Sequence, residues 1–231
     1  HHPSQTAYAL AIDFNLIPEE TMAQTTNYFV ESIHRRDNHL SVGFLGISHL
    51  LPALTKCGQN ELAFTLLEQK GNPGWLYSVI NGATTIWERW NSYIAETGTF
   101  GDVSMNSFNH YAYGSIGQWL YRTVLGIQTG EEKDEAGYHR IFLTPSWGGA
   151  LTYAKGEQET PFGKITSSWE KKENSIVYHC TIPANTTAHL SLPASDHNSV
   201  QILEGAAIAD TAVSSVADFE LVSRSYTFKI C

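Results

Sequence analysis

A single carboxylate, Glu88, stands among aromatic residues. Trp87 and Trp90 flank it, Trp75 lies upstream, and Arg89 follows it directly. Indole rings pack against the CH faces of a pyranose sugar, and the hydroxyls of the sugar need charged or amide partners. Cleavage of a glycosidic bond needs carboxyl groups. These residue types favour a carbohydrate site in which Glu88 supplies one carboxyl group.

The spacing of Thr85 and Glu88 also fits a helix start. In the S/T-x-x-E capping box, the glutamate side chain accepts a hydrogen bond from a backbone N–H at the first turn of a helix. Such matches are common, so spacing alone favours the cap. The catalytic and the structural roles of Glu88 both stay open at this point.

Composition excludes several classes of partner. The chain has 231 residues, of which 42% are hydrophobic and 12% aromatic, enough to bury a sizeable core. Its formal net charge is −9 with only 14 Lys and Arg. Nucleic acids and anionic membranes bind clustered positive charge, so neither is expected as a partner.

The sequence contains no pattern for a metal site, a cofactor or a membrane span. Cys57, Cys180 and Cys231 are far apart and odd in number, which indicates plain thiols rather than a disulfide framework or a zinc site. No apolar run approaches the roughly 18 to 20 residues that span a bilayer, and no signal stretch opens the chain. The chain runs almost directly from His1 into a helical pattern, so we do not expect His1 to be a natural N-terminus.

The first part of the chain carries helical periodicity. Apolar residues at i, i+3, i+4 and i+7 and terminal signals such as Pro18 and Gly58 predict successive helices. We expect a turn at 71–74 and an exposed loop at 96–106. The predicted helices cover residues 5–14, 18–34, 47–57, 61–69 and 108–125.

The character of the chain changes near the acidic run 131–135, which we interpret as a solvated linker. Beyond it, short β-branched and aromatic runs alternate with turn residues, which is typical of an antiparallel β-sandwich. We predict a helical domain over 1–135 and a β-sandwich over 136–231, because helices followed by strands indicate two units. The eight expected strands are 138–143, 150–156, 163–170, 175–182, 187–192, 200–203, 219–222 and 226–230.

Several stretches, in this order, make the chain resemble the C-terminal part of bacterial α-L-rhamnosidases of glycoside hydrolase family 78. Two of them are G-A-T-T-I-W-E-R-W at 82–90 and S-F-N-H-Y-A-Y-G at 107–114. The likeness runs over nearly the whole chain, and further matching stretches lie at 5–11, 18–20, 39–46, 74–77 and 138–148.

The resemblance implies an (α/α)6 toroid with the sugar site at one end, followed by a β-sandwich. A complete toroid has twelve helices, whereas about four to five precede the linker here. We therefore expect a C-terminal fragment of a longer enzyme, inactive alone. Its partners would be a rhamnose-containing glycoside and the upstream remainder of the catalytic domain.

The resemblance also implies roles for individual residues. Glu88 corresponds to the family's general base in an inverting hydrolysis, and His110 to a histidine that binds the rhamnose hydroxyls. The family's general acid lies in an upstream motif that residues 1–231 do not contain, so no acid is assigned. Inversion requires two carboxyl groups roughly 6.5 to 9.5 Å apart, of which this chain would supply one.

The other candidate residues have structural alternatives. Trp75, Trp87 and Trp90 either line the rhamnose pocket or pack in the core, and Arg89 either binds at the site or forms a structural ion pair. His39 and Asn109 are candidates for their motifs only. Three alternatives remain at this point: a carbohydrate-binding fragment without hydrolysis, a structural role for the sandwich, and another glycosidase on the same toroid.

Overall fold

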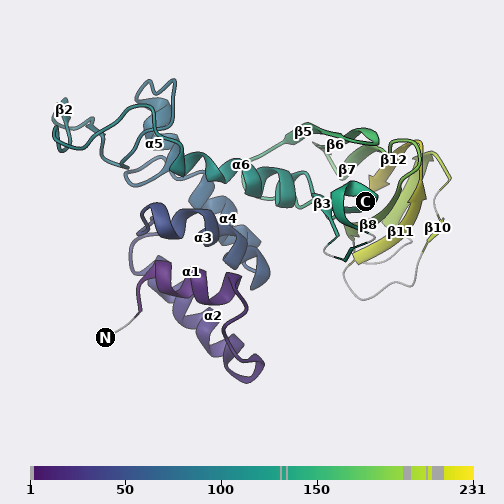
Figure 1. The fold of residues 1–231 in the computed structure, drawn as a ribbon, viewed down its shortest axis with the longest axis horizontal. Helices are drawn as coiled ribbons and strands as arrows, with labels where there is room; N and C mark the ends of the chain where they lie inside the picture. Colours follow the sequence, from purple (N-terminus) through teal and green to yellow (C-terminus); the bar gives the residue numbers. More distant parts are fainter. Residues whose placement is uncertain (1–2, 131, 134, 195–198, 207, 210–215) are drawn as a thin grey trace. The chain divides into compact units, whose positions relative to one another are not determined.

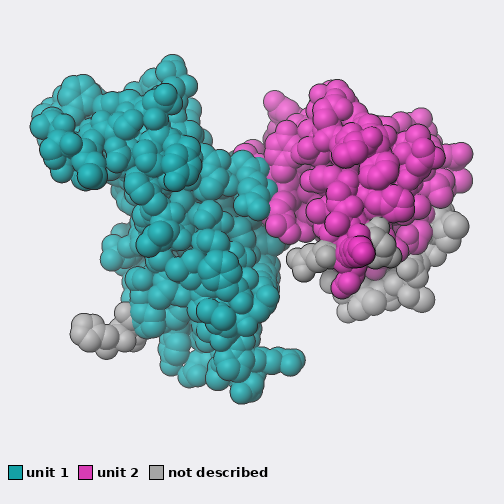
Figure 2. Space-filling model, viewed as in Figure 1, with its two compact units in different colours: residues 1–119, 148–150 teal, residues 120–147, 151–231 magenta. Residues whose placement is uncertain are grey.

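The computed structural model describes residues 3–130, 132–133, 135–194, 199–206, 208–209 and 216–231. The chain forms two compact units (Figures 1 and 2). Unit 1 comprises His1–Trp119 with Gly148–Ala150, and unit 2 comprises Leu120–Trp147 with Leu151–Cys231. Helices dominate the first unit and mostly antiparallel sheets the second, as the sequence predicted.

Four of the five helices predicted from periodicity are confirmed, with small shifts at their ends, and a further short helix at Trp75–Ile80 was not predicted. Ser4 caps α1, because its hydroxyl accepts a hydrogen bond from the backbone N–H of Ala7 (3.2 Å). Pro18 is the N-cap of α2, one position before the first helical residue. The helices are α1 (Gln5–Asp13), α2 (Glu19–His34), α3 (Phe44–Lys56), α4 (Asn60–Leu67) and the short α5 (Trp75–Ile80).

The core of unit 1 forms around α3, whose Leu50 and Leu54 are fully buried. Gln5, a buried polar residue of α1, ties that helix to the segment before α3. Its side-chain N–H donates to the carbonyl of His39 (3.2 Å) and its side-chain oxygen accepts from the backbone N–H of Ser41 (2.7 Å). This anchoring fixes the loop that enters α3.

Two local predictions for unit 1 are wrong. Residues 81–90 form turns and irregular backbone rather than a helix, so Glu88 is not part of a capping box. The helix expected from Phe108 begins only at Ala112, because residues 107–110 hydrogen-bond to residues 86–88. It runs as a 3-10 helix (Ala112–Ser115), α6 (Ile116–Trp119) and a π-helical turn (Leu120–Val124).

The expected loop at 96–106 is largely exposed. It overlaps a hairpin of residues 93–100 that the sequence did not reveal. Its strands β1 (Tyr93–Ile94) and β2 (Thr99–Phe100) are antiparallel. Two-residue strands are too short to show period-2 alternation, so no sequence pattern marks them.

Unit 2 contains two five-stranded sheets, ordered β10-β11-β8-β4-β3 and β5-β6-β7-β12-β9. All eight predicted strands are present, and the only parallel pairing among these described strands is β4 with β8. The short β3 and β10 were not predicted. The strands are β3 (Ile127–Thr129), β4 (Arg140–Leu143), β5 (Tyr153–Thr160), β6 (Gly163–Lys172), β7 (Ser175–Thr181), β8 (Thr187–Pro193), β9 (Val200–Glu204), β10 (Ile208–Ala209), β11 (Val216–Val222) and β12 (Ser225–Ile230).

Because β3 pairs with β4, residues 127–129 belong to a sheet of unit 2, although the sequence assigned them to the helical domain. The core of this unit follows the alternation of its strands, as in β8, where Leu190 and Leu192 are buried. Trp169 of β6 is also buried, and its indole N–H donates to the carbonyl of Val124 (2.8 Å). The acidic run 131–135 lies partly outside the described residues.

The three cysteines are free thiols, and burial raises the pKa of the Cys180 thiol well above its usual range. Among the described residues, no helix is long and apolar enough to cross a membrane. In the same part of the chain, no group of three or more His, Cys, Asp or Glu side chains is arranged to hold a metal ion.

Candidate active site

Two segments of unit 1 that are distant in sequence pair around Glu88. The backbone N–H of Glu88 donates to the carbonyl of Ser107 (2.8 Å), and the backbone N–H of His110 donates to the carbonyl of Ile86 (2.8 Å). The Thr85 hydroxyl donates to the carbonyl of Phe108. These contacts hold the Glu88 segment and the His110 segment side by side.

The carboxylate of Glu88 is part of this pairing. Its Oε2 accepts a hydrogen bond from the backbone N–H of Ser107 at 2.6 Å, and the side chain is only partly buried. Within the described part of the chain, Oε1 has no hydrogen-bond partner. One oxygen is therefore held by backbone while the other is available to a ligand or a water molecule.

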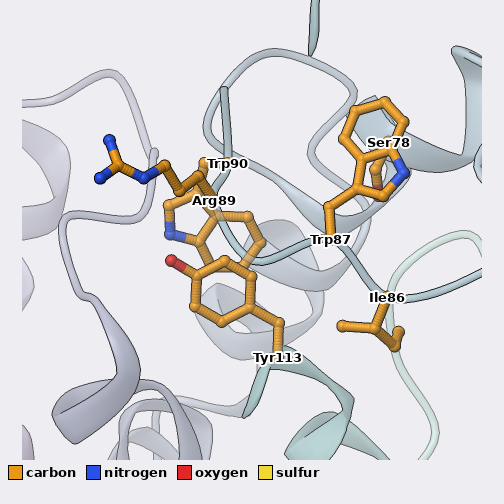
Figure 3. A pocket seen from close by; sticks show the side chains of 6 residues that line it. All are labelled: Ser78, Ile86, Trp87, Arg89, Trp90 and Tyr113. Carbon is orange, nitrogen blue, oxygen red and sulfur yellow. The ribbon is translucent and has the colours of Figure 1, made fainter. Parts of the chain in front are cut away.

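An aromatic cluster forms around Trp90, two residues after Glu88, and Figure 3 shows its Trp90 and Tyr113. The rings of Trp90 and Tyr113 stack with centroids 3.8 Å apart and planes 8° apart, and Trp75 meets Trp90 edge-on at 5.4 Å. The indole N–H of Trp90 donates to the carbonyl of Val42 (2.9 Å), and that of Trp75 to the carbonyl of Tyr113 (2.9 Å). Because both indoles have backbone partners, the cluster is fixed in orientation as well as packed.

The cluster forms one side of a small pocket with a cavity volume of about 10 Å³, room for about one water molecule. Binding pockets for whole ligands usually enclose roughly 300 to 1,000 Å³. This pocket is therefore far smaller than a site for a whole sugar. Its lining residues are Ser78, Ile86, Trp87, Arg89, Trp90 and Tyr113 (Figure 3).

Three of the sequence candidates, Trp87, Arg89 and Trp90, meet in this pocket. Trp87 is also largely buried, with its ring edge-on to Phe108 at 5.4 Å. Trp75 packs behind Trp90 rather than in the lining. Their contacts with substrate stay predictions.

The sequence did not identify Tyr113, Ser78 or Ile86 as site residues. Tyr113 was expected only on a helix face, although it stands in the N-H-Y-A-Y-G stretch. The position of Tyr113 three residues after His110 in the same motif could have identified it as a site residue.

Arg89 lies beside an acidic residue of the exposed loop. Its guanidinium is 3.6 Å from a carboxylate oxygen of Asp102, and both side chains are more than one-third exposed. An ion pair with this exposure stabilises a protein little. The pair orients Arg89 at the rim of the pocket without committing all five of its N–H donors.

Asp102 provides a pH-dependent test of this rim. Hydrogen bonds from the hydroxyl (2.6 Å) and the backbone N–H (2.9 Å) of Ser104 lower the pKa of the Asp102 carboxyl below its usual 3.8, and Arg89 adds a smaller lowering effect. A lowered folded-state pKa contributes stability above the unfolded value, which is lost as the pH falls through the folded pKa. We therefore expect the loop contacts of Asp102 to persist to a pH below 3.8.

NMR titration of the Asp102 carboxyl carbon in the 231-residue chain measures the pKa of Asp102 directly. Ser104→Ala is expected to raise the pKa of Asp102 more than Arg89→Gln does, because Ser104 makes the larger contribution. The reverse order would show that the ion pair, not the serine, controls this carboxylate.

His110 lies between two aromatic rings, stacked on Phe44 at 4.6 Å and on Tyr111 at 5.1 Å. Its Nδ1 accepts a hydrogen bond from the backbone N–H of Ala112 (3.2 Å). In the neutral ring Nε2 must then carry the proton, so His110 presents a hydrogen-bond donor to a ligand. Asn109 is exposed, and its backbone N–H donates to the Ser107 hydroxyl (3.1 Å).

His39 makes a different set of contacts. Its Nδ1 lies 2.9 Å from the carbonyl oxygen of Asp37 and 3.1 Å from that of Arg36, beyond the end of α2. Its Nε2 lies 2.6 Å from where a side-chain carbon at Gly71 would stand, so the ring packs closely on that turn. These contacts are structural, and a role of His39 in binding stays a prediction.

With this geometry established, comparison with known proteins gives consistent matches. Residues 1–124 match the family model of the bacterial alpha-L-rhamnosidase 6 hairpin glycosidase domain, and residues 126–207 match that of the bacterial alpha-L-rhamnosidase C-terminal domain. The first match covers more than half of the chain.

Individual relatives agree. An alpha-L-rhamnosidase of Streptomyces avermitilis is 38% identical over 227 residues, which is 98% of this chain and 21% of that relative. One from Formosa agariphila is 41% identical over 199 residues, which is 86% of this chain and 21% of that relative. The chain thus spans about a fifth of the length of these relatives.

A solved structure extends the likeness to three dimensions. The crystal structure of the Streptomyces avermitilis alpha-L-rhamnosidase complexed with L-rhamnose superposes with a TM-score of 0.90 at 38% identity, covering 98% of this chain and 21% of that one. The resemblance to the C-terminal part of these proteins is confirmed, and the chain belongs to the bacterial alpha-L-rhamnosidase family.

Proposed function

We propose that this chain is the part of an inverting α-L-rhamnosidase that carries the general base, Glu88. The observation that supports this most is the Glu88 carboxylate, which is anchored through Oε2 to the backbone of Ser107 and belongs to a segment whose Trp87 and Arg89 line a small pocket. The relatives named alpha-L-rhamnosidase, and the complex of one of them with L-rhamnose, supply the substrate class.

In the proposed reaction, Oε1 of Glu88 accepts a proton from a water molecule that attacks the anomeric carbon. The anchored Oε2 keeps the carboxylate in one orientation, so that proton transfer needs little rearrangement. The leaving oxygen receives its proton from a general acid outside this chain. The two carboxyl groups act on opposite sides of the sugar, which gives inversion.

Neighbouring residues would bind the sugar. The Nε2–H of His110 donates to a rhamnose hydroxyl, since Nδ1 is already occupied by the backbone N–H of Ala112. Tyr113 stacks on one face of Trp90 and Trp75 packs edge-on with it, so only the part of the Trp90 ring that these two leave uncovered would contact the CH surface or the methyl group of rhamnose. Arg89 lies at the rim, where its free N–H donors are within reach of sugar hydroxyls.

The finer architecture belongs to the same proposal. Unit 1 would supply the last helices of an (α/α)6 toroid, and the two sheets of unit 2 would form a β-sandwich with a structural role that does not act on substrate. The predicted division into 1–135 and 136–231 stays a prediction for the whole protein.

Hydrolysis of p-nitrophenyl α-L-rhamnoside tests this function. We expect the complete enzyme to release p-nitrophenol and the 231-residue chain alone to release none, because one carboxyl group is half of an inverting site. Proton NMR of the first product should show β-L-rhamnose before mutarotation. Initial α-L-rhamnose would contradict inversion, and activity of the folded 231-residue chain would contradict an acid outside it.

A further inference from the structure

Tyr113 is a buried tyrosine whose hydroxyl has no internal partner. The residue is 6% exposed, and its hydroxyl makes no hydrogen bond to any described residue. The hydroxyl of Tyr77 bonds to Tyr93 and Ala95, and that of Tyr178 accepts from Ser167, whereas that of the buried Tyr8 also makes no hydrogen bond to a described residue. The hydroxyl oxygen of Tyr113 itself is not enclosed, so it reaches solvent and is open to a ligand that enters the pocket.

The ring of Tyr113 is held firmly, so its hydroxyl has a defined position. It stacks on Trp90, packs edge-on against Phe44 at 5.6 Å, and its carbonyl accepts the indole N–H of Trp75. The residue lines the pocket, and Figure 3 shows the hydroxyl directed to the side along which Arg89 extends. The position is thus rigid and reaches the open space of the pocket.

The electrostatic surroundings keep this hydroxyl protonated at neutral pH. Burial raises the pKa of Tyr113 above 10.0, while Arg89 lowers it and Glu88 raises it by smaller amounts. The protonated hydroxyl can donate one hydrogen bond and accept another.

We propose that the Tyr113 hydroxyl is a further substrate-binding group, which donates a hydrogen bond to one ring hydroxyl of the sugar. This inference rests on the proposed function and adds a contact that neither Glu88 nor His110 supplies. A deoxysugar that lacks the contacted hydroxyl loses this hydrogen bond, so Tyr113 acts on specificity among deoxysugars.

Tyr113→Phe in the complete enzyme is the test, because it keeps the stack on Trp90 and removes only the hydroxyl. We expect kcat/KM for p-nitrophenyl α-L-rhamnoside to fall about tenfold, with an unchanged melting temperature. The decisive measurement repeats the comparison with the 2-, 3- and 4-deoxy analogues of this substrate. The difference between wild type and variant should disappear for the single analogue that lacks the contacted hydroxyl.

Tyr178→Phe is the matched control, since it removes a buried hydroxyl that bonds inside unit 2. It should lower the melting temperature and leave kcat/KM unchanged. If the wild-type enzyme is active, two results overturn the inference. One is a kcat/KM of Tyr113→Phe within twofold of wild type, and the other is a loss of kcat/KM that is equal for all deoxy analogues. A wild-type enzyme without rhamnosidase activity would instead remove the proposed function itself, and this inference with it.

Discussion

Glu88→Gln in the complete enzyme should lower kcat for p-nitrophenyl α-L-rhamnoside by about 10² to 10⁴-fold, the usual range for loss of a general acid or base. An amide has nearly the shape of a carboxylate but does not take a proton from water. Its oxygen still accepts from the backbone N–H of Ser107, so the pairing between the Glu88 and His110 segments is retained. The loss should therefore appear in kcat, with KM and the melting temperature nearly unchanged.

Glu96→Gln is the control for Glu88→Gln. Glu96 is exposed in the loop that follows the same segment, so the same chemical change there should leave kcat as in wild type. If Glu88→Gln kept most of the activity, Glu88 would not be the base. If Glu88→Gln lost both activity and the fold, the contact to Ser107 would be essential to structure. Calorimetry with L-rhamnose separates a folded variant without catalysis, which still binds the sugar, from an unfolded variant, which does not.

Trp169→Ala should lower the free energy of unfolding of the 231-residue chain by about 3 to 5 kcal/mol, the range for truncating a buried tryptophan. The side chain is 1% exposed in the core of unit 2 and lies 6.4 Å from the ring of Trp147. Its removal leaves a cavity and also takes the hydrogen bond away from the carbonyl of Val124. The cavity and the lost hydrogen bond both lower the free energy of unfolding.

Urea denaturation followed by circular dichroism measures this loss. Tyr153→Ala is the control on the neighbouring strand β5, because that side chain is 68% exposed and should change the free energy of unfolding by less than about 0.5 kcal/mol. A loss below about 1 kcal/mol for Trp169→Ala would mean that the surrounding side chains close the cavity.

Secondary structure was predictable wherever a local pattern extends over several residues. The stripe of α3 and the alternation of β8 each specify which residues are buried, and the structure buries them. The sequence pattern did not predict strands that are short, nor the pairing of strands from distant parts of the chain. The strands β1, β3 and β10 have two or three residues each, and β4 pairs in parallel with β8 from a distant part of the chain.

The candidate site was predictable only in its residue types. The sequence identified Glu88 and His110 through their motifs, and Trp90 through its position beside Glu88. It did not show that the backbone of Ser107 holds the Glu88 carboxylate, nor that Tyr113 covers one face of Trp90. It also supported a cap for Glu88 that the structure replaces with this contact.

Secondary structure was predictable and the geometry of the site was not, and this difference has a physical cause. Helix and strand periodicity, turn residues and net charge are properties of neighbouring residues, and these determined the order of helices and strands and excluded nucleic acid and membrane surfaces as expected partners. The partner of a carboxylate or a ring is decided by which distant segment folds beside it. Glu88 lies 19 residues from Ser107, so tertiary structure alone decided the orientation of the proposed base.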